Sequence, residues 1–211
     1  MRQNGVFIYS AYIYSVMGNI THKWVNILLP FTGNYGGMLS GTELAKLSNT
    51  PQQTASRYLN ELVRQNLIGY STQGRNKLYH FDHSKQSTKT VYEILESHKG
   101  IIFQQKAMEA FTVIAEMLGC TESLIVFGSY SSYTFDESSD LDVVLVGKCD
   151  KEKIKRIKQR QTMRINEHYV SYEEFESMIK SGNPLSIEIL KNHVVFGDVS
   201  KIVSVFIRAS S

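Results

Sequence analysis

Residues 124–147 read LIVFGSYSSYTFDESSDLDVVLVG, and this stretch decides the fold of the C-terminal half. An apolar run, Ser123–Phe127, predicts a short buried strand that continues directly into Gly-Ser. Ten residues later, Asp140-Leu-Asp142 opens the apolar run VVLV, which predicts a second buried strand. The stretch therefore predicts two strands joined by a loop that is small and polar at one end and acidic at the other.

The Gly-Ser pair, the ten-residue spacing and the Asp-x-Asp pair resemble the minimal nucleotidyltransferases of the DNA polymerase beta superfamily. The resemblance covers about residues 120–200. It implies transfer of a nucleoside monophosphate from an NTP, with ATP as the expected donor, to an unknown acceptor, with Mg²⁺ or Mn²⁺ as cofactor. It assigns catalysis and metal binding to Asp140 and Asp142, and binding of the nucleotide phosphates to Gly128 and Ser129.

Physical chemistry agrees with these roles. Alternate side chains of a strand share one face, so Asp140 and Asp142 should point the same way. Two adjacent carboxylates repel each other unless a cation lies between them, and Mg²⁺ prefers oxygen ligands while leaving positions for phosphates. One ion can activate an attacking hydroxyl and a second can stabilise the departing pyrophosphate. Gly128 permits close approach of the backbone, and Ser129 offers a hydroxyl and an N–H.

The turn after Gly-Ser departs from the family pattern. The family commonly has a small residue, a basic residue and a glycine there, as in GS-x-A-[RK]-G. Ser131 is small, but Ser132 replaces the base and Tyr133 replaces the glycine. One cation that binds phosphate is therefore missing from its usual place.

The third acidic position departs as well. The family's third carboxylate lies on a later strand, and Met163–Val170 is the corresponding predicted strand. Its apolar residues align Asn166 with the acidic position and turn Glu167 the other way. Asn166 can coordinate through its carbonyl but cannot act as a base, and Glu167 could substitute only if the strand shifts or bulges.

The C-terminal tail also resembles the end of that family. It predicts a helix over Tyr172–Lys180 capped by Ser171, a helix over Pro184–Lys191, a strand over His193–Phe196 and a helix over Val199–Phe206. A basic run precedes the tail. We interpret it as a solvated helix face, with binding of substrate phosphates as the alternative; its residues are Lys153, Lys155, Arg156, Lys158 and Arg160.

The N-terminal half reads as helices followed by a hairpin. Thr21–Phe31 has helical apolar spacing, and Thr42 is the predicted cap of a short helix, Glu43–Leu47. A tight turn follows, with Thr50 as N-cap and Pro51 at the first helical position. The next helix, Gln52–Gln65, precedes two predicted strands, Leu67–Tyr70 and Lys77–Phe81, which flank a polar tip that contains Gly74.

The strings TELAKLSNTPQQTASRYLNELVRQNLI (42–68) and GRNKLYHF (74–81) resemble winged helix-turn-helix domains of prokaryotic, archaeal-type regulators. The resemblance implies binding of double-stranded DNA, with the second helix in the major groove and the hairpin tip on phosphates. A small helical domain for protein contacts or dimerisation is the alternative. The candidate DNA-binding residues are Gln52, Gln53, Thr54, Ser56, Arg57, Asn60, Arg75 and Lys77.

Composition limits the remaining choices. A hydrophobic fraction of 42% permits a packed core, and stretches such as Trp24–Phe31 are too short to cross a membrane. Without a clear signal-peptide pattern the protein is expected in the cytoplasm. Cys120 and Cys149 are isolated, which argues against disulfides and zinc. Residues 1–82 hold seven Lys/Arg and three Asp/Glu, an excess that points towards a polyanionic partner.

These observations predict an α+β protein with three parts: a winged helix-turn-helix over residues 1–83, a helical connector over 84–119 and a nucleotidyltransferase-type mixed sheet with flanking helices over 120–211. The connector is expected to divide into two helices at Gly100 and to pack between the modules, or else to form a homodimer interface. Residues 1–18 fit a strand or a helix. The alternatives to an enzyme are a DNA-binding transcriptional regulator with a degenerate, nucleotide-sensing domain and a structural partner such as a toxin–antitoxin component.

Overall fold

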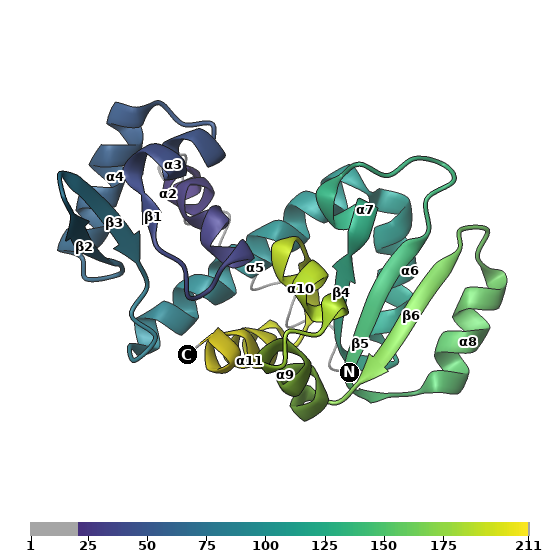
Figure 1. Ribbon diagram of the computed structural model, residues 1–211. Coiled ribbons are helices and arrows are strands. Elements are labelled where there is room, and N and C mark those ends of the chain that lie inside the picture. The colour runs from purple at the N-terminus through teal and green to yellow at the C-terminus, as the bar shows by residue number, and fades with distance from the viewer. Residues whose placement is uncertain (1–20, 211) are drawn as a thin grey trace.

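A computed structural model describes residues 21–210, in which two groups of elements are joined by one long helix (Figure 1). Residues 1–18, for which the sequence left strand and helix open, lie outside the described residues. The first group contains three α-helices and a sheet of antiparallel strands in the order β1-β3-β2. Its elements are α2 (Thr21–Leu28), the 3₁₀ helix η1 (Leu29–Gly33), β1 (Leu39–Ser40), α3 (Gly41–Leu47), α4 (Gln52–Arg64), β2 (Gly69–Gln73) and β3 (Asn76–His80).

The start of α3 differs from the predicted one. Ser40, not Thr42, is the N-cap, because Ser40 and Glu43 form a reciprocal pair. The backbone N–H of Glu43 donates to the Ser40 hydroxyl at 3.2 Å, and the backbone N–H of Ser40 donates to the Glu43 carboxylate at 2.8 Å. Two of the N–H groups at the helix start are thereby satisfied, which a cap at Thr42 would not achieve.

Two other helix ends differ from prediction. α4 begins at Gln52 with Pro51 as its N-cap and without a side-chain cap, so the predicted capping role of Thr50 was wrong. The Thr50 hydroxyl instead donates to the Ser48 carbonyl at 3.2 Å. α2 ends at Leu28 rather than Phe31 and passes into a 3₁₀ helix with proline in its first turn. Proline has no N–H to continue the α-helical ladder.

The predicted division of the connector at Gly100 was also wrong. α5 (Gln86–Lys106) is continuous through Gly100, and the break comes at Ala107, where φ is −134° and ψ is 55°. α6 (Met108–Leu118) follows. A Cβ on Gly100 would meet the Phe196 ring at 3.4 Å, so this glycine permits close packing of the helix rather than interrupting it.

The second group is built on a four-stranded sheet in the order β6-β5-β4-β7. Only β5 and β6 are parallel among these strands, so the predicted mixed sheet is confirmed. The elements are β4 (Thr121–Phe127), α7 (Gly128–Ser132), β5 (Leu141–Cys149), α8 (Lys151–Arg160), β6 (Ile165–Val170), α9 (Tyr172–Lys180), α10 (Pro184–Lys191), β7 (Val194–Gly197) and α11 (Val199–Ser210). The Ser171 cap of α9 is confirmed by a capping box with Glu174.

Helices cover both faces of this sheet. On one face Leu124 and Val143 pack in a core with α6 and α8. On the other face Ile125 and Val144 belong to a larger core that includes α9, α10, α11 and the N-terminal helices. The alternation of strand side chains thus supplies two separate cores. Among residues 21–210, no helix is both long and apolar enough to cross a membrane.

A buried charged cluster lies where the two groups meet. Glu96 of α5 is fully buried and accepts hydrogen bonds from the Tyr35 hydroxyl at 2.8 Å and from His193 Nε2 at 3.1 Å. Its second oxygen lies 2.8 Å from Lys99 Nζ. Tyr35 also accepts a hydrogen bond at its carbonyl from the Tyr92 hydroxyl at 2.9 Å. The cluster ties the N-terminal group to the segment between α10 and β7.

Candidate functional site

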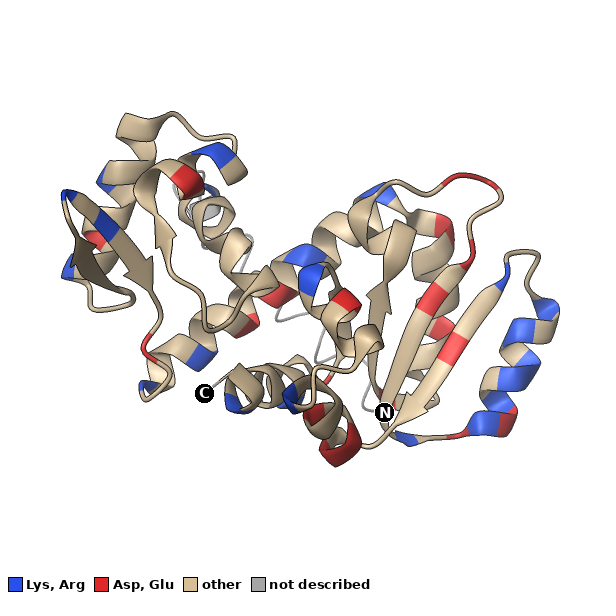
Figure 2. Cartoon of the chain, in the orientation of Figure 1, with Lys and Arg blue, Asp and Glu red and all other residues tan. Residues whose placement is uncertain are grey.

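The turn after β4 and the start of β5 are held against each other. Phe127 pairs with Asp142 in the antiparallel register, so Gly128 lies beside Asp142. Gly128 has a φ of +67°, and a Cβ there would come within 2.5 Å of Asp142 Oδ2. Glycine is therefore required both for the backbone conformation and for the space that the carboxylate fills. Acidic residues gather at this end of β5 and in the loop before it (Figure 2).

The two predicted carboxylates meet at one side chain. Asn166 Nδ2 donates to Asp142 Oδ1 at 3.0 Å and to Asp140 Oδ2 at 3.3 Å. Asp142 and Asn166 are partners in the parallel register of β5 and β6. Both aspartates are partly exposed. A neutral amide gives each anion one hydrogen bond but cancels neither charge.

Of the two candidates for a third ligand, the structure brings only Asn166 to the carboxylates. Glu167 pairs with Val143 in the register, faces the α8 side of the sheet and forms an ion pair with Lys158. Among residues 21–210, no group of three or more His, Cys, Asp or Glu side chains is arranged to hold a metal ion. The oxygen ligands available here to a metal ion are those of the two carboxylates, towards which Asn166 points its NH₂ group.

The short helix α7 begins at Gly128 and contains three serines that differ in their surroundings. The buried Ser131 hydroxyl lies within hydrogen-bond distance of the carbonyls of Gly128, at 2.9 Å, and Asn192, at 3.1 Å. The Ser132 hydroxyl folds back on the same turn, 3.1 Å from the Gly128 carbonyl. The Ser129 hydroxyl has no hydrogen-bond partner among the described residues, so it remains available to a ligand.

Tyr133, which stands where the family has a glycine, adopts a backbone conformation that favours glycine. Its φ is +57°, the left-handed region, which costs a non-glycine residue about 1 kcal/mol or more. The ring packs 6.4 Å from Phe103, and the Lys106 ammonium lies 4.4 Å from the ring centroid. Burial raises the pKa of Tyr133 to about 12. Packing of the ring thus holds a backbone conformation that glycine would adopt freely.

A shallow hollow beside Asp142 contains residues that sequence reasoning missed. His168 and Glu188 line it together with Asp142 and Asn166. The rings of His168 on β6 and Phe127 on β4 are 6.2 Å apart, so both lean over β5, the strand between them. His168 has a sequence signal, since it lies two residues after Asn166 on one strand face. Glu188 has none, because only packing of α10 brings it here.

The N-terminal candidates divide between a helix and a hairpin. On α4, Thr54 and Ser56 are partly buried, and the other four candidates are exposed: Gln52, Gln53, Arg57 and Asn60. Gln52 Nε2 donates to the Thr42 hydroxyl at 3.1 Å. Arg75 and Lys77 are exposed on the β2–β3 hairpin, and Lys77 Nζ lies 4.3 Å from the Tyr70 ring centroid. The structure thus leaves six of the eight side chains open to a partner.

Comparison with known proteins adds one finding to this geometry. Residues 108–200 match the family model described as nucleotidyltransferase domain. The match runs from the start of α6 into α11 and includes the whole four-stranded sheet. Searches of curated proteins and of solved structures found no match. The match supports a nucleotidyltransferase domain in the C-terminal half, and chemistry of that general type.

Proposed function

We propose that residues 108–200 transfer a nucleoside monophosphate from an NTP, with ATP as the donor, to an acceptor hydroxyl, and that Asp140 and Asp142 hold the required divalent metal ion. One observation carries the proposal: both carboxylates meet at the amide of Asn166, and Asp142 rests against Gly128 at the start of α7. The family match to the same residues supports the reaction class.

The donor set fits Mg²⁺ or Mn²⁺. Both are hard ions that bind oxygen, and Asp140 and Asp142 offer carboxylate oxygens. Rotation of the Asn166 amide would exchange its NH₂ group for its carbonyl oxygen as a third donor. Mg²⁺ is usually bound by only one or two protein carboxylates, because it keeps positions for water and substrate phosphates. When bound, the ion neutralises negative charge on the phosphates and on the two carboxylates.

The chain's own groups then bind and orient the nucleotide. Gly128 lets the backbone turn closely past the Asp142 carboxylate, and the Ser129 hydroxyl, which has no partner among residues 21–210, would donate to a phosphate oxygen. The acceptor oxygen forms a bond to the α-phosphorus, the bond from that phosphorus to the bridging oxygen breaks, and pyrophosphate leaves. Asn166 cannot take the acceptor's proton, so that proton passes to solvent or to another group that lines the hollow, His168 or Glu188.

The test uses ATP labelled in its α-phosphate, with Mg²⁺ or Mn²⁺, the full chain and candidate acceptors: RNA, proteins, small hydroxyl compounds and the chain itself. Wild type should transfer the label and the Asp140→Asn/Asp142→Asn double variant should not. Glu137→Gln removes a charge from the exposed loop before the site and is the matched control, with transfer unchanged. Transfer by the double variant at the wild-type rate would sink the site assignment.

We also propose that residues 21–83 form a winged helix-turn-helix that binds double-stranded DNA. Three helices followed by a hairpin, with β1 completing the sheet, support this assignment. The exposed side chains of α4 would lie in the major groove and the hairpin tip on phosphates. In mobility shifts Arg75→Ala/Lys77→Ala should weaken binding to all duplexes alike and reduce the salt dependence. Unchanged shifts would contradict the role of the hairpin.

A second candidate function follows from Asn166 and Ser132. Asn166 stands where the family has its third carboxylate, and Ser132 stands where it has a basic residue. A domain without these two groups would bind a nucleotide without transferring part of it, and the bound nucleotide would change DNA binding by the N-terminal module. Calorimetry separates the two candidates. Binding of ATP and of a non-hydrolysable analogue, without transfer to any acceptor, favours the sensor, whereas transfer favours the enzyme.

A further inference from the structure

α8 and the end of the strand before it carry a larger net positive charge than the whole chain. The thirteen residues Lys148–Arg160 contain seven Lys/Arg and two Asp/Glu, an excess of five. The whole chain has a net charge of +3, so the remaining residues sum to −2. In Figure 2 the blue positions form a band along α8, at the end of the molecule away from the N-terminal helices.

Packing does not require these charges. Ile154 and Ile157, three residues apart, are buried and attach α8 to the sheet. The basic side chains occupy the outward positions, where any polar residue would serve the fold equally well. The excess charge therefore calls for an explanation beyond helix packing.

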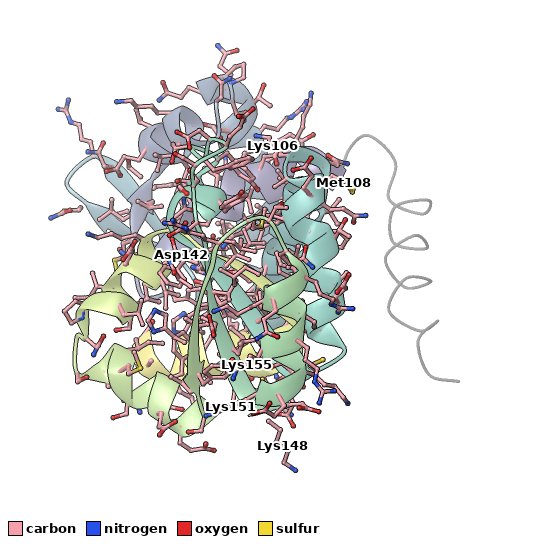
Figure 3. The ribbon with its side chains drawn as sticks, turned by 90° about the vertical axis from the view of Figure 1, so that its right-hand side faces the viewer. Lys106, Met108, Asp142, Lys148, Lys151 and Lys155 are labelled. Carbon is pink, nitrogen blue, oxygen red and sulfur yellow. The ribbon has the colours of Figure 1, made fainter. Side chains whose placement is uncertain are left out.

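Part of the charge is neutralised within the molecule. Lys153 lies 3.2 Å from Asp150, Arg160 lies 3.3 Å from Glu116, and Lys158 pairs with Glu167. The other four cations form no ion pair with any residue of 21–210: Lys148, Lys151, Lys155 and Arg156. Figure 3 shows the three lysines of this set towards one end of the molecule, away from Asp142.

The surroundings of these cations distinguish between classes of partner. Lys151 Nζ lies 4.8 Å from the centroid of the partly buried Tyr169 ring. Arg156 lines a shallow hollow between α6 and α8, together with the ion pair of Arg160 and Glu116. A membrane-binding helix needs an apolar face to insert, but the apolar residues of α8 are buried against the sheet. The large exposed apolar side chains of the described residues lie elsewhere: Met38, Leu47, Tyr70, Met108 and Ile187.

We propose that α8, with Lys148, is a second nucleic-acid-binding surface that holds a strand through its phosphates. A row of flexible ammonium groups suits a repeating polyanion, and neutralised phosphates release counterions that drive association. The surface is separate from the α4 and hairpin surface, and it does not depend on nucleotidyl transfer. It would allow the chain to contact nucleic acid at both ends.

The experiment measures binding of the full chain to 20-nucleotide single-stranded RNA and DNA over a range of salt concentrations. The test variant is Lys148→Gln/Lys151→Gln/Lys155→Gln. The net-charge control removes the same number of exposed lysines from α9, α10 and α11, of which Lys180 and Lys201 form ion pairs: Lys180→Gln/Lys191→Gln/Lys201→Gln. The test variant should lose about 10-fold or more in affinity, and its log–log salt slope should fall by about 2, since each single-strand phosphate contact contributes roughly 0.7. The control should change less than about 2-fold by the same reasoning.

Three outcomes would overturn the proposal. Equal losses in the test and control triples would show a dependence on net charge only. Loss of strand binding in Arg75→Ala/Lys77→Ala, with full binding in the α8 variant, would place all contacts in the N-terminal group. Binding of phosphatidylserine vesicles without binding of either strand would identify a lipid surface. Loss in the α8 triple alone supports the proposal, and the RNA and DNA arms then show which strand is preferred.

Discussion

The buried carboxylate of Glu96 and the partly exposed pair Asp140 and Asp142 differ in how their negative charge is compensated. Glu96 is completely buried, and Tyr35, Lys99 and His193 surround it with donors from different parts of the chain. Asp140 and Asp142 are partly exposed, and their shared protein donor is one neutral amide. A buried charge must be compensated within the fold, whereas an exposed pair can be left for a ligand to compensate. The first arrangement serves stability, and the second is suited to binding.

The largest expected effect comes from removing the buried charge. Glu96→Gln leaves the Lys99 ammonium next to a neutral amide at the same buried position, and breaking one partner of a buried pair typically costs about 3–5 kcal/mol. Urea unfolding followed by circular dichroism would measure this loss. A change below about 1 kcal/mol would mean that the cluster is not held as described.

The stability of the protein should fall in acid as the same carboxylate, Glu96, becomes protonated. Lys99 and His193 outweigh burial and lower the pKa of Glu96 from 4.5 to about 2. Because the folded pKa is the lower one, the stabilisation is complete above pH 4.5 and is lost as the pH falls towards 2. This lowering of the pKa corresponds to a stabilisation on the order of 3 kcal/mol. Unfolding measured from pH 6 to 3 should show a steeper decline for wild type than for Glu96→Gln, and parallel curves would contradict the assignment.

The exposed pair should behave in the opposite way. Asp142→Asn removes a carboxylate whose loss relieves repulsion with Asp140, so stability should stay within about 0.5 kcal/mol or rise. Binding of ATP in the presence of Mg²⁺ should weaken by about 100-fold, since a metal ligand of the proposed site is lost. Calorimetry and thermal unfolding would measure both quantities. Equal nucleotide affinity in Asp142→Asn and the Glu137→Gln control would remove the site from consideration.

The smallest effect is expected at an ordinary surface pair. Glu116 and Arg160 lie 3.3 Å apart with both side chains well exposed, and such pairs contribute about 0–1 kcal/mol. Glu116→Gln should therefore shift the urea midpoint only slightly, and less at high salt. A loss comparable to that of Glu96→Gln would show that burial does not explain the difference between the two regions.

The sequence predicts those features of the fold and the site that depend on residues close together in the chain or related by the alternation of side chains along a strand. The apolar runs around Gly-Ser and Asp-x-Asp predicted two paired strands, and counting along 163–170 placed Asn166 beside the carboxylates, as the register shows. Choices between neighbouring polar residues were less certain, since Ser40 and Thr42 can each cap a helix. Gly100 was mistaken for a break because its reason is tertiary, the approach of Phe196.

Contacts between distant segments left no local pattern. Glu96 and His193 are 97 residues apart, and neither has a neighbour that marks it as a partner. Glu188 reaches the hollow beside Asp142 only through the packing of α10. The α8 run could be seen in the sequence, but which of its cations lack a partner depends on the positions of Glu116 and Glu167.

The continuity of α5 has a consequence for any attempt to excise either half. Val91, Tyr92 and Leu95 in its first part belong to the core shared with α2–α4, whereas Phe103 in its last part belongs to the core shared with α6. A fragment that ends at residue 83 would lack α5, which covers its core. A fragment that begins at residue 120 would lack α6, which packs against one face of the sheet. Fragments cut at either boundary should therefore aggregate or unfold, and heating the intact chain should melt both halves in a single cooperative transition.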